Sequence, residues 1–506
     1  MLDSAAAAQD RSFRRLEKPN QSNSDWVRSF EDAPREHGFE PVHVEGKIPD
    51  DLVGTLYWNG SAFYDLTPPE LRTWTDGQGG IGAVHIPGGG AAPSFGLRRI
   101  RTRSMELEHA AGKRIYSRFG MRSKQPIREF LLGDRRTTAN ITCWCYRGRI
   151  FALDTISKLT EVDPNSLETL GETDLNGSAP PALSAHGGLC AARRTYYNFS
   201  PVYGRQSYLD LYAFPLESRP YRVTRIPLAA ACYVHSFIVT DNYAIFIIPP
   251  MTLRPLPMVL GLKAAKDCIV WRPELGTECV VVNFDAPERP IRCTIDARLH
   301  VHVANAFERK GEVVVHVPFS NESHDGVLKT WQWFTGLASG KPGLGPDPRM
   351  HELRIDVQTG RARVERLADR VFEQPRISPR SEGRDYRYIF GAGFIGSGAQ
   401  LPDALLTFDL KTNTISETRH KGCYLAEPVF VPREHSTAEN DGYLLSVAYE
   451  PEAHTSSLLV FDAREAQSAP LCRLAFDHHV PPFFHASWVG RGDEVTGSVA
   501  PGRRVG

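Results

Sequence analysis

The sequence has no excess of charge of either sign, because 59 lysine and arginine residues balance 59 aspartate and glutamate residues. Proteins that bind nucleic acid through its phosphates carry a basic excess or a basic stripe. The balanced composition therefore predicts no nucleic-acid partner.

Cysteines are few and poorly placed for a structural role. The 506-residue chain has nine of them, an odd number, and they form no Cys-x-x-Cys pair. Cys143 and Cys145 are the only close pair, and their spacing suits zinc chelation poorly. We expect reduced, mostly buried thiols, as in a cytoplasmic protein.

Long apolar runs are also missing, since none approaches the roughly 18 residues of a membrane-spanning helix. The alanine run near the N-terminus is flanked by Asp3, Asp10 and Arg11 and contains no long apolar core, so no signal peptide is expected. Residues 1–30 are polar and lack periodicity, which predicts a flexible N-terminal arm. Residues 31–506 are expected to fold as one domain.

Glycine and proline are abundant, and they divide the chain into short strand-like runs from Phe39 onward. This pattern predicts an all-β fold in which residues 256–266 form one of few helices. A strand that ends in aspartate, followed by a short turn and a second strand, recurs and predicts the outer hairpins of β-propeller blades. The turns follow Asp163, Asp356, Asp409 and Asp462.

Four histidines lie in short apolar settings that are far apart in the sequence. The first is in segment 299–311, whose alternating pattern predicts a strand that carries His300 and His302 on one face and turns near Lys310. An imidazole on a packed face needs a polar partner or a metal, and hydrogen-bonded core histidines are the alternative. The similar settings are centred on His186, His235 and His485.

Such distant residues cannot form a local chelating loop. Only a closed, roughly radial fold would bring them to one point, as the axis of a propeller does. Imidazole suits iron, zinc and copper alike, so the residues alone do not choose the metal.

Five motifs in order make the chain from about residue 36 to 488 resemble the carotenoid cleavage oxygenase family. These are non-haem iron dioxygenases that act on carotenoids, apocarotenoids or stilbenoids. The motifs are residues 44–60, His235-Ser236-Phe237, the His-x-x-Asn-Ala segment from His302, residues 427–433, and Phe484-His485. The resemblance implies a seven-bladed β-propeller with a loop and helix cap over a central iron site, and residues 31–506 would be this catalytic domain.

The resemblance assigns Fe(2+) to His186, His235, His302 and His485, and its motif selects His302 over His300. It implies that Glu373 and Glu427 accept hydrogen bonds from the ligands' other ring nitrogens. A third glutamate of the family is replaced, because this chain has Ala152-Leu153-Asp154-Thr155 where the family has Ala-Leu-x-Glu. Thr155 brings no charge, and the ligand affected would be His186 or its neighbour.

Two segments would face the substrate. Ile141 falls where the family has an apolar group beside the open iron position, and ordinary core packing is the alternative. Residues 74–80 replace a Gly-rich run of the family and predict a turn in the substrate-facing region.

Residues 247–266 are apolar but too short to span a bilayer, and three cations accompany them. The resemblance suggests a membrane-dipping patch for substrate access, which predicts peripheral membrane contact of a cytoplasmic protein. A proline-rich loop folded onto the propeller is the alternative. The residues expected to contact lipid or substrate are Met251, Leu253, Leu256, Met258, Val259 and Leu260.

The implied function is iron(II)-dependent cleavage of a conjugated C=C bond of a carotenoid or apocarotenoid by O2, giving carbonyl products. Cleavage of stilbenoids or phenylpropenes is an alternative within the family, but Ser104 stands where its stilbene-cleaving members have a lysine. A non-catalytic propeller that binds an apolar ligand is the other alternative, and the retention of four histidines argues against it. The polyene, the bond cleaved and the oligomeric state stay open.

Overall fold

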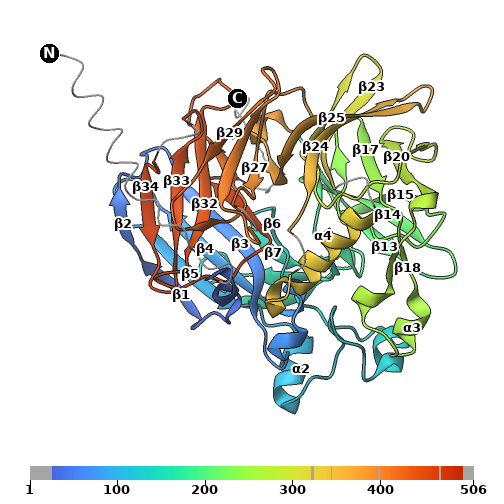
Figure 1. The fold of residues 1–506 in the computed structure, drawn as a ribbon, viewed down its shortest axis with the longest axis horizontal. Helices are drawn as coiled ribbons and strands as arrows, with labels where there is room; N and C mark the ends of the chain where they lie inside the picture. The colour runs from blue at the N-terminus through green and yellow to red at the C-terminus, as the bar shows by residue number, and fades with distance from the viewer. Residues whose placement is uncertain (1–24, 321–323, 343–344, 397–398, 466–468, 494–506) are drawn as a thin grey trace.

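The computed structural model describes residues 25–320, 324–342, 345–396, 399–465 and 469–493 (Figure 1). Seven antiparallel sheets of four or more strands follow one another along the chain, and they form the blades of a β-propeller. The predicted all-β, seven-bladed fold is therefore confirmed.

Blades 2 to 6 are four-stranded meanders, which we describe from the innermost strand outward. Blade 2 is β6 (Thr142–Tyr146), β7 (Arg149–Leu153), β9 (Leu159–Val162) and β10 (Thr169–Thr173). Blade 3 is β12 (Gly188–Cys190), β13 (Thr195–Val202), β14 (Tyr208–Pro215) and β15 (Tyr221–Pro227). Blade 4 is β16 (Ile238–Val239), β17 (Tyr243–Ile248), β20 (Thr277–Asn283) and β21 (Ile291–Ile295). Blade 5 is β22 (Asn305–Arg309), β23 (Glu312–Ser320), β24 (Pro348–Asp356) and β25 (Ala362–Val371), and blade 6 is β26 (Glu373–Arg376), β27 (Tyr388–Gly393), β28 (Ala404–Asp409) and β29 (Thr414–Thr418).

The two ends of the chain close the ring by exchanging strands. In blade 1 the C-terminal strand is innermost, and the order is β35 (His485–Gly490), β3 (Gly54–Phe63), β4 (Gln78–Ile86), β5 (Ser94–Arg99) and β1 (His37–Pro41). In blade 7 an N-terminal strand is outermost, and the strands are β30 (Tyr424–Leu425), β31 (Val429–Pro432), β32 (Gly442–Glu450), β33 (Thr455–Asp462), β34 (Cys472–Ala475) and β2 (His43–Gly46). The register Asn59↔His485 places the first residue of β35 beside β3.

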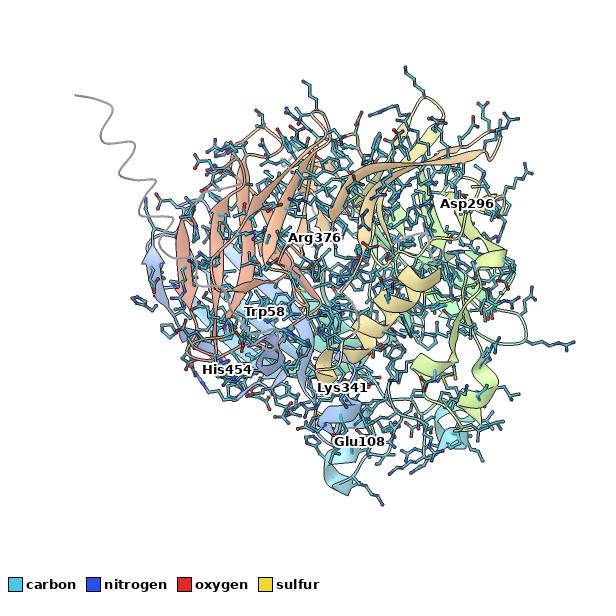
Figure 2. The ribbon with its side chains drawn as sticks, in the orientation of Figure 1. Trp58, Glu108, Asp296, Lys341, Arg376 and His454 are labelled. Atoms are coloured by element: carbon cyan, nitrogen blue, oxygen red, sulfur yellow. The ribbon has the colours of Figure 1, made fainter. Side chains whose placement is uncertain are left out.

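The hydrophobic core lies between neighbouring blades and not at the axis. Trp58 is 1% exposed and stacks on Phe95, Phe476 and Phe483 between blades 1 and 7, at the position labelled in Figure 2. Strands covered on both faces read as unbroken apolar runs, as β23 does at 313–315. Because the blades bury their apolar faces against one another, the residues at the axis are polar.

Short helices and two small sheets lie outside the blades. In Figure 1 helices α2 and α3 are at the lower edge of the view, and α4 lies between them and the sheets. The helices are α2 (Arg103–Ala111), α3 (Pro255–Val259), α4 (His324–Gly336) and the π-helix η4 (Ile127–Leu131). The 3-10 helices are η1 (Asp25–Phe30), η2 (Pro69–Leu71), η3 (Trp74–Asp76), η5 (Ala265–Cys268), η6 (Pro273–Leu275), η7 (Leu337–Ser339) and η8 (Pro379–Ser381). The small sheets are β8 (Ile156–Ser157) with β11 (Leu183–Ser184), and β18 (Met251–Leu253) with β19 (Ile269–Trp271).

The four aspartate turns connect paired strands, as predicted. Asp163 accepts hydrogen bonds from the backbone N–H groups of Asn165 (2.9 Å) and Ser166 (2.8 Å). Asp356, Asp409 and Asp462 likewise accept from backbone N–H groups two residues on. An aspartate that bonds its own turn in this way favours a tight reversal. The turn after Asp462 is not an outermost hairpin, because β2 adds outside β34.

Three sequence predictions need correction. The arm predicted for 1–30 is wrong at 25–30, where η1 buries Trp26 (3% exposed) and Phe30 (3% exposed); residues 1–24 lie outside the described residues. The helix predicted for 256–266 stops at Val259, because Gly261 adopts φ +69° and leaves the helical conformation. The strand predicted for 299–311 forms only at Asn305–Arg309.

The cysteines and helices agree with the expectations on burial and length. All nine cysteines are free thiols, and all except Cys293 are buried. Within the described ranges, no helix is both long and apolar enough to cross a membrane.

Candidate metal centre

The axial ends of the innermost strands supply the residues of the site. His485 and Glu373 are the first residues of β35 and β26. Five further residues each lie just before an inner strand: His186 before β12, His235 before β16, His302 before β22, Glu427 before β31 and Ile141 before β6. Each of the seven blades therefore contributes one residue to the same place, which is how positions far apart in the sequence come together.

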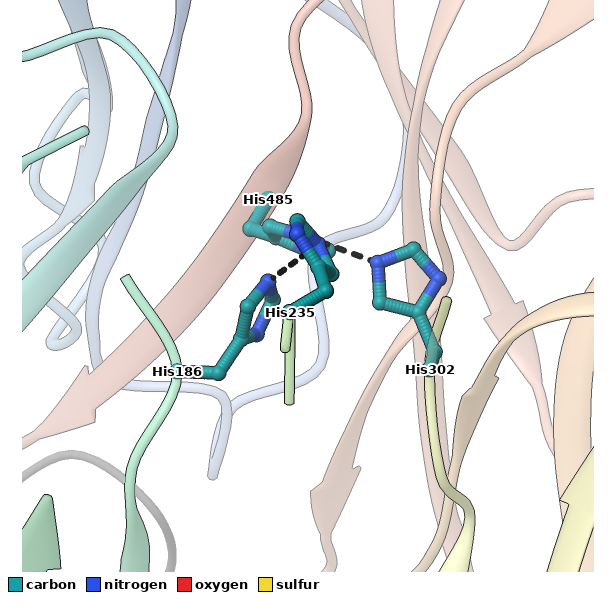
Figure 3. Close-up of side chains that lie close together, drawn as sticks. All are labelled: His186, His235, His302 and His485. Carbon is teal, nitrogen blue, oxygen red and sulfur yellow. Dashed lines mark hydrogen bonds between the residues drawn. The ribbon is translucent and has the colours of Figure 1, made fainter. Parts of the chain in front are cut away.

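The four histidines converge on one point (Figure 3). The Nε2 atoms of His186 and His235 are 2.9 Å apart, and those of His302 and His485 are 3.2 Å apart. One ring nitrogen of each residue lies within 4.8 Å of the others, an arrangement that could hold a metal ion. Burial, together with the neighbouring imidazoles, lowers the pKa of His186 and His235 well below the usual value, so these rings are neutral and offer lone pairs.

Two glutamates contact the outer nitrogens of two of these rings. His302 Nδ1 donates to Glu373 Oε2 (2.7 Å), and His485 Nδ1 donates to Glu427 Oε1 (2.9 Å). A proton held on Nδ1 leaves the Nε2 lone pair directed at the centre. This donor set, with neutral imidazoles inside and carboxylates behind them, fits a divalent transition metal.

The carboxylate of Glu427 is kept ionised by its surroundings. Burial alone would raise its pKa, but the Arg376 guanidinium and His485 outweigh this effect and lower the pKa to about 2. Arg376 donates to Glu427 Oε2 at 2.8 Å, and it lies near the middle of the view in Figure 2.

The third histidine has a different partner. The Tyr233 hydroxyl lies 2.8 Å from His235 Nδ1, and the Thr155 side chain lies beside Tyr233. The histidine on the side of Thr155, where the family has its third glutamate, is thus His235, the neighbour of His186 in the set. Sequence reasoning did not identify Tyr233, although its position two residues before His235 was a usable signal.

His300 and His302 do not share a face, contrary to the strand prediction. The ladder is interrupted between Leu299, whose carbonyl accepts from Ser320 N–H, and Ala304, whose N–H donates to the His316 carbonyl. His302 reaches the axis across this break, while His300 Nε2 donates to the Ile247 carbonyl at 2.7 Å. His300 is therefore a hydrogen-bonded core histidine.

Ile141 is buried and lines the same apolar cavity as His235, His302 and His485. The preceding residue, Asn140, donates to Ser61 Oγ, Thr75 O and Gly77 O at 2.8–3.0 Å and so fixes the segment. Trp74, from the predicted substrate-facing turn, stacks on Phe484 with a centroid separation of 4.5 Å.

Two cavities meet at the four histidines. One, of about 510 Å³, is lined mainly by apolar side chains and by His235, His302 and His485, with His300 also on its wall. The other, of about 800 Å³, follows the inner strands and is lined by His186, His302 and His485 with Arg376, Arg380 and Glu382. The centre is thus reached from an apolar side and from a polar, axial side.

The residues predicted for substrate access divide into two groups. Met251, Leu253 and Met258 line the apolar cavity, while Leu256 (66% exposed) and Leu260 (56% exposed) face outward, and Val259 is half-buried. Sequence reasoning missed a second exposed apolar segment around η4. Its exposed residues are Ile127, Leu131 and Leu132, and the run Phe130-Leu131-Leu132 was the available signal.

Comparisons with known proteins agree with this geometry. The family model described as retinal pigment epithelial membrane protein matches residues 30–490. The chain is 30% identical to the apocarotenoid-15,15'-oxygenase of Synechocystis sp. over 488 residues, which cover 92% of this chain and 96% of that one. It is 26% identical to isoeugenol monooxygenase of Pseudomonas nitroreducens over 475 residues, or 89% and 94% of the two chains.

The solved structures lead to the same family. A variant of the Synechocystis apocarotenoid oxygenase superposes with a TM-score of 0.84 at 27% identity and covers 93% of this chain and 99% of that chain. Both the sequence match and the superposition extend over nearly all seven blades. The chain therefore belongs to the retinal pigment epithelial membrane protein family, the family of the carotenoid cleavage oxygenases.

Proposed function

We propose that this protein is an iron(II)-dependent dioxygenase that cleaves a conjugated C=C bond of an apocarotenoid or carotenoid into two carbonyl products. The observation that carries this proposal is the four-histidine group, three of whose members line an apolar cavity. His186, His235, His302 and His485 would hold Fe(2+), and Glu373 and Glu427 would orient His302 and His485. When bound there, iron would supply the activation of O2.

The chain's own residues would position the substrate and exclude water. The cavity volume of about 510 Å³ lies within the range of roughly 300–1,000 Å³ that is usual for one small ligand. Aromatic side chains from the cap line it, namely Phe119, Phe130, Trp331 and Phe334, together with Trp74 and Ile141. Such a lining suits a rigid, apolar polyene that must be held with one double bond at the centre.

The position of Ser104 weakens the stilbenoid alternative. Ser104 is buried, and its hydroxyl donates to the Thr137 carbonyl at 3.2 Å. It is absent from the described lining of the apolar cavity, so it cannot contact a phenol there. A polyene without a phenolic end group is therefore the favoured substrate class.

The mouth of this cavity supports substrate uptake from a membrane surface. Exposed apolar side chains occur on two segments, at Ile127, Leu131 and Leu132 and at Leu256, Leu260 and Leu262. The segments are adjacent, because Lys266 N–H donates to the Phe119 carbonyl (3.1 Å) and a Cβ on Gly261 would lie 3.2 Å from Pro126. Arg254 and Lys263 are exposed nearby and could meet lipid head groups.

The test combines metal content with turnover. Protein purified without added metal, a His302→Ala variant and a His300→Ala control are assayed for iron and then incubated in air with an apocarotenal or with resveratrol. We expect near-stoichiometric iron in the wild type and in His300→Ala but not in His302→Ala, and we expect loss of polyene absorbance with the wild type and none with His302→Ala. Turnover of resveratrol alone would overturn the carotenoid assignment. An iron-free protein that stays inactive after reconstitution would indicate a propeller that only binds.

A further inference from the structure

Three of the four histidines have a side-chain partner on Nδ1, and one of these partners differs in charge from the other two. Glu373 and Glu427 are carboxylates, whereas the partner of His235 is the phenol of Tyr233 at 2.8 Å. The separations are alike, so the phenol occupies the same geometric place as a carboxylate. A phenol with an ordinary pKa near 10 is neutral at physiological pH.

The hydrogen bond between His235 and Tyr233 has a defined direction when His235 binds a metal. A metal ligand that binds through Nε2 carries its proton on Nδ1, so His235 donates to the Tyr233 oxygen. The phenolic proton then points away from His235, on the side of Tyr233 where the Thr155 side chain lies. The backbone N–H of Tyr233 donates to the Met251 carbonyl at 2.8 Å, which holds the tyrosine in place.

Asp154 is the nearest carboxylate in the chain that could have replaced the glutamate, but it is engaged elsewhere. Its Oδ2 accepts from the backbone N–H (3.0 Å) and the hydroxyl (2.9 Å) of Thr138. Its Oδ1 accepts from the backbone N–H of Ile156 at 3.0 Å. The Asp154 carboxylate therefore binds Thr138 and Ile156 and not His235. The residues on the Nδ1 side of His235 are Tyr233 and Thr155.

We propose that Tyr233, oriented by Thr155, is a positioning residue that takes the place of a carboxylate and fixes the ring and tautomer of His235 for the metal. This inference rests on the proposed function, because it assumes a metal at the four histidines. Only two carboxylates then face the ligand set, and Arg376 offsets the charge of one of them. Of the three histidines with a partner on Nδ1, His235 is consequently the least basic. The strength of its bond to the metal depends on one neutral hydroxyl group.

Cobalt(II) binding tests this role without turnover. Metal-free full-length protein is titrated with Co(II), and the visible absorption of the bound ion reports both affinity and coordination. Loss of a partner that orients a metal ligand typically weakens affinity about 10- to 100-fold. We expect Tyr233→Phe to raise the dissociation constant by that factor and to change the Co(II) spectrum, and Thr155→Val to raise it by a smaller factor.

Tyr203→Phe is the matched control. Tyr203 lines the same apolar cavity, and its hydroxyl donates to the Cys232 carbonyl at 3.0 Å, next in sequence to Tyr233. Its loss also removes one tyrosine hydroxyl and one hydrogen bond, but no contact with a histidine. We expect wild-type Co(II) affinity and spectrum in Tyr203→Phe.

The outcomes separate this inference from the proposed function. Equal effects of Tyr233→Phe and Tyr203→Phe on affinity and spectrum would overturn the positioning role. Wild-type protein that binds Co(II) but cleaves no polyene as the iron form would overturn the proposed function alone. Wild-type protein that binds no Co(II) would overturn the metal centre and this inference together.

Discussion

His302 and His485 bring their Nε2 atoms to 3.2 Å although 183 residues separate them in the chain. His302 precedes the inner strand of blade 5, and His485 begins the inner strand of blade 1. The glutamates that contact them come from the blades between, Glu373 from blade 6 and Glu427 from blade 7. Each glutamate thus contacts the histidine of the adjacent blade, and the blade order alone determines which pairs form.

Replacing Glu373 with glutamine should weaken metal binding about 10- to 100-fold, because His302 would lose a charged acceptor on Nδ1. Metal content after dialysis against a graded chelator would measure the change. Glu352→Gln is the control, since Glu352 contacts His316 (3.2 Å) in a pair outside the four-histidine group. A similar loss of metal in both variants would contradict this assignment.

The stability contributed by Glu427 should depend on pH. Its pKa in the folded protein is about 2, below the ordinary value near 4.3, so the charged carboxylate stabilises the fold above about pH 4. This contribution is lost as the pH falls toward 2. Free energies of unfolding of the metal-free wild type and Glu427→Gln, measured from pH 7 to pH 2, should differ by roughly 3 kcal/mol at neutral pH and converge in acid. A difference that does not change with pH would refute the prediction.

Removal of exposed leucines at the cavity mouth should release the protein from vesicles. Leu131→Ser/Leu132→Ser should lower binding to phosphatidylserine-containing vesicles about tenfold or more, since burial of one leucine side chain contributes about 1.5–3 kcal/mol. Vesicle flotation would measure the bound fraction. Leu170→Ser should bind as the wild type does, because Leu170 is 61% exposed but belongs to β10 of blade 2. Equal losses in the two variants would argue against a localised membrane patch.

Truncation of Ile141 should open space beside the centre. Ile141→Ala should destabilise the fold by about 2–5 kcal/mol, because Ile141 is buried in a cluster with Trp74, Ala185 and Phe484. Admission of water should also raise the O2 consumed per product formed. An oxygen electrode combined with product quantification would measure this ratio, and Ile389→Ala is the control, because Ile389 is buried and is absent from the described lining of both cavities. A ratio that is unchanged in Ile141→Ala would indicate ordinary core packing.

Local signals in the sequence were sufficient for the all-β class and for the outer hairpins of blades, whereas the number of blades came from the resemblance to the family. The aspartate turns at Asp163, Asp356 and Asp409 could be predicted because an aspartate bonds its own turn, whatever surrounds it. The strand at 299–311 was predicted too long, since alternation cannot reveal that the ladder is interrupted before Ala304. Segment 25–30 was assigned to a flexible arm because its two aromatics acquire a partner surface only in the folded propeller.

The sequence by itself determined the all-β class, because strand periodicity is a local property of the chain, and its motifs predicted the four histidines and the two glutamates through their resemblance to the family. Only the tertiary structure decided which partner each histidine has, how His300 differs from His302, and that Tyr233 and Thr155 stand behind His235. The physical reason is that the site is built where seven inner strands meet, so the contacts of the histidines with one another and with the two glutamates join different blades. Such contacts depend on the closure of the ring, which no single segment encodes.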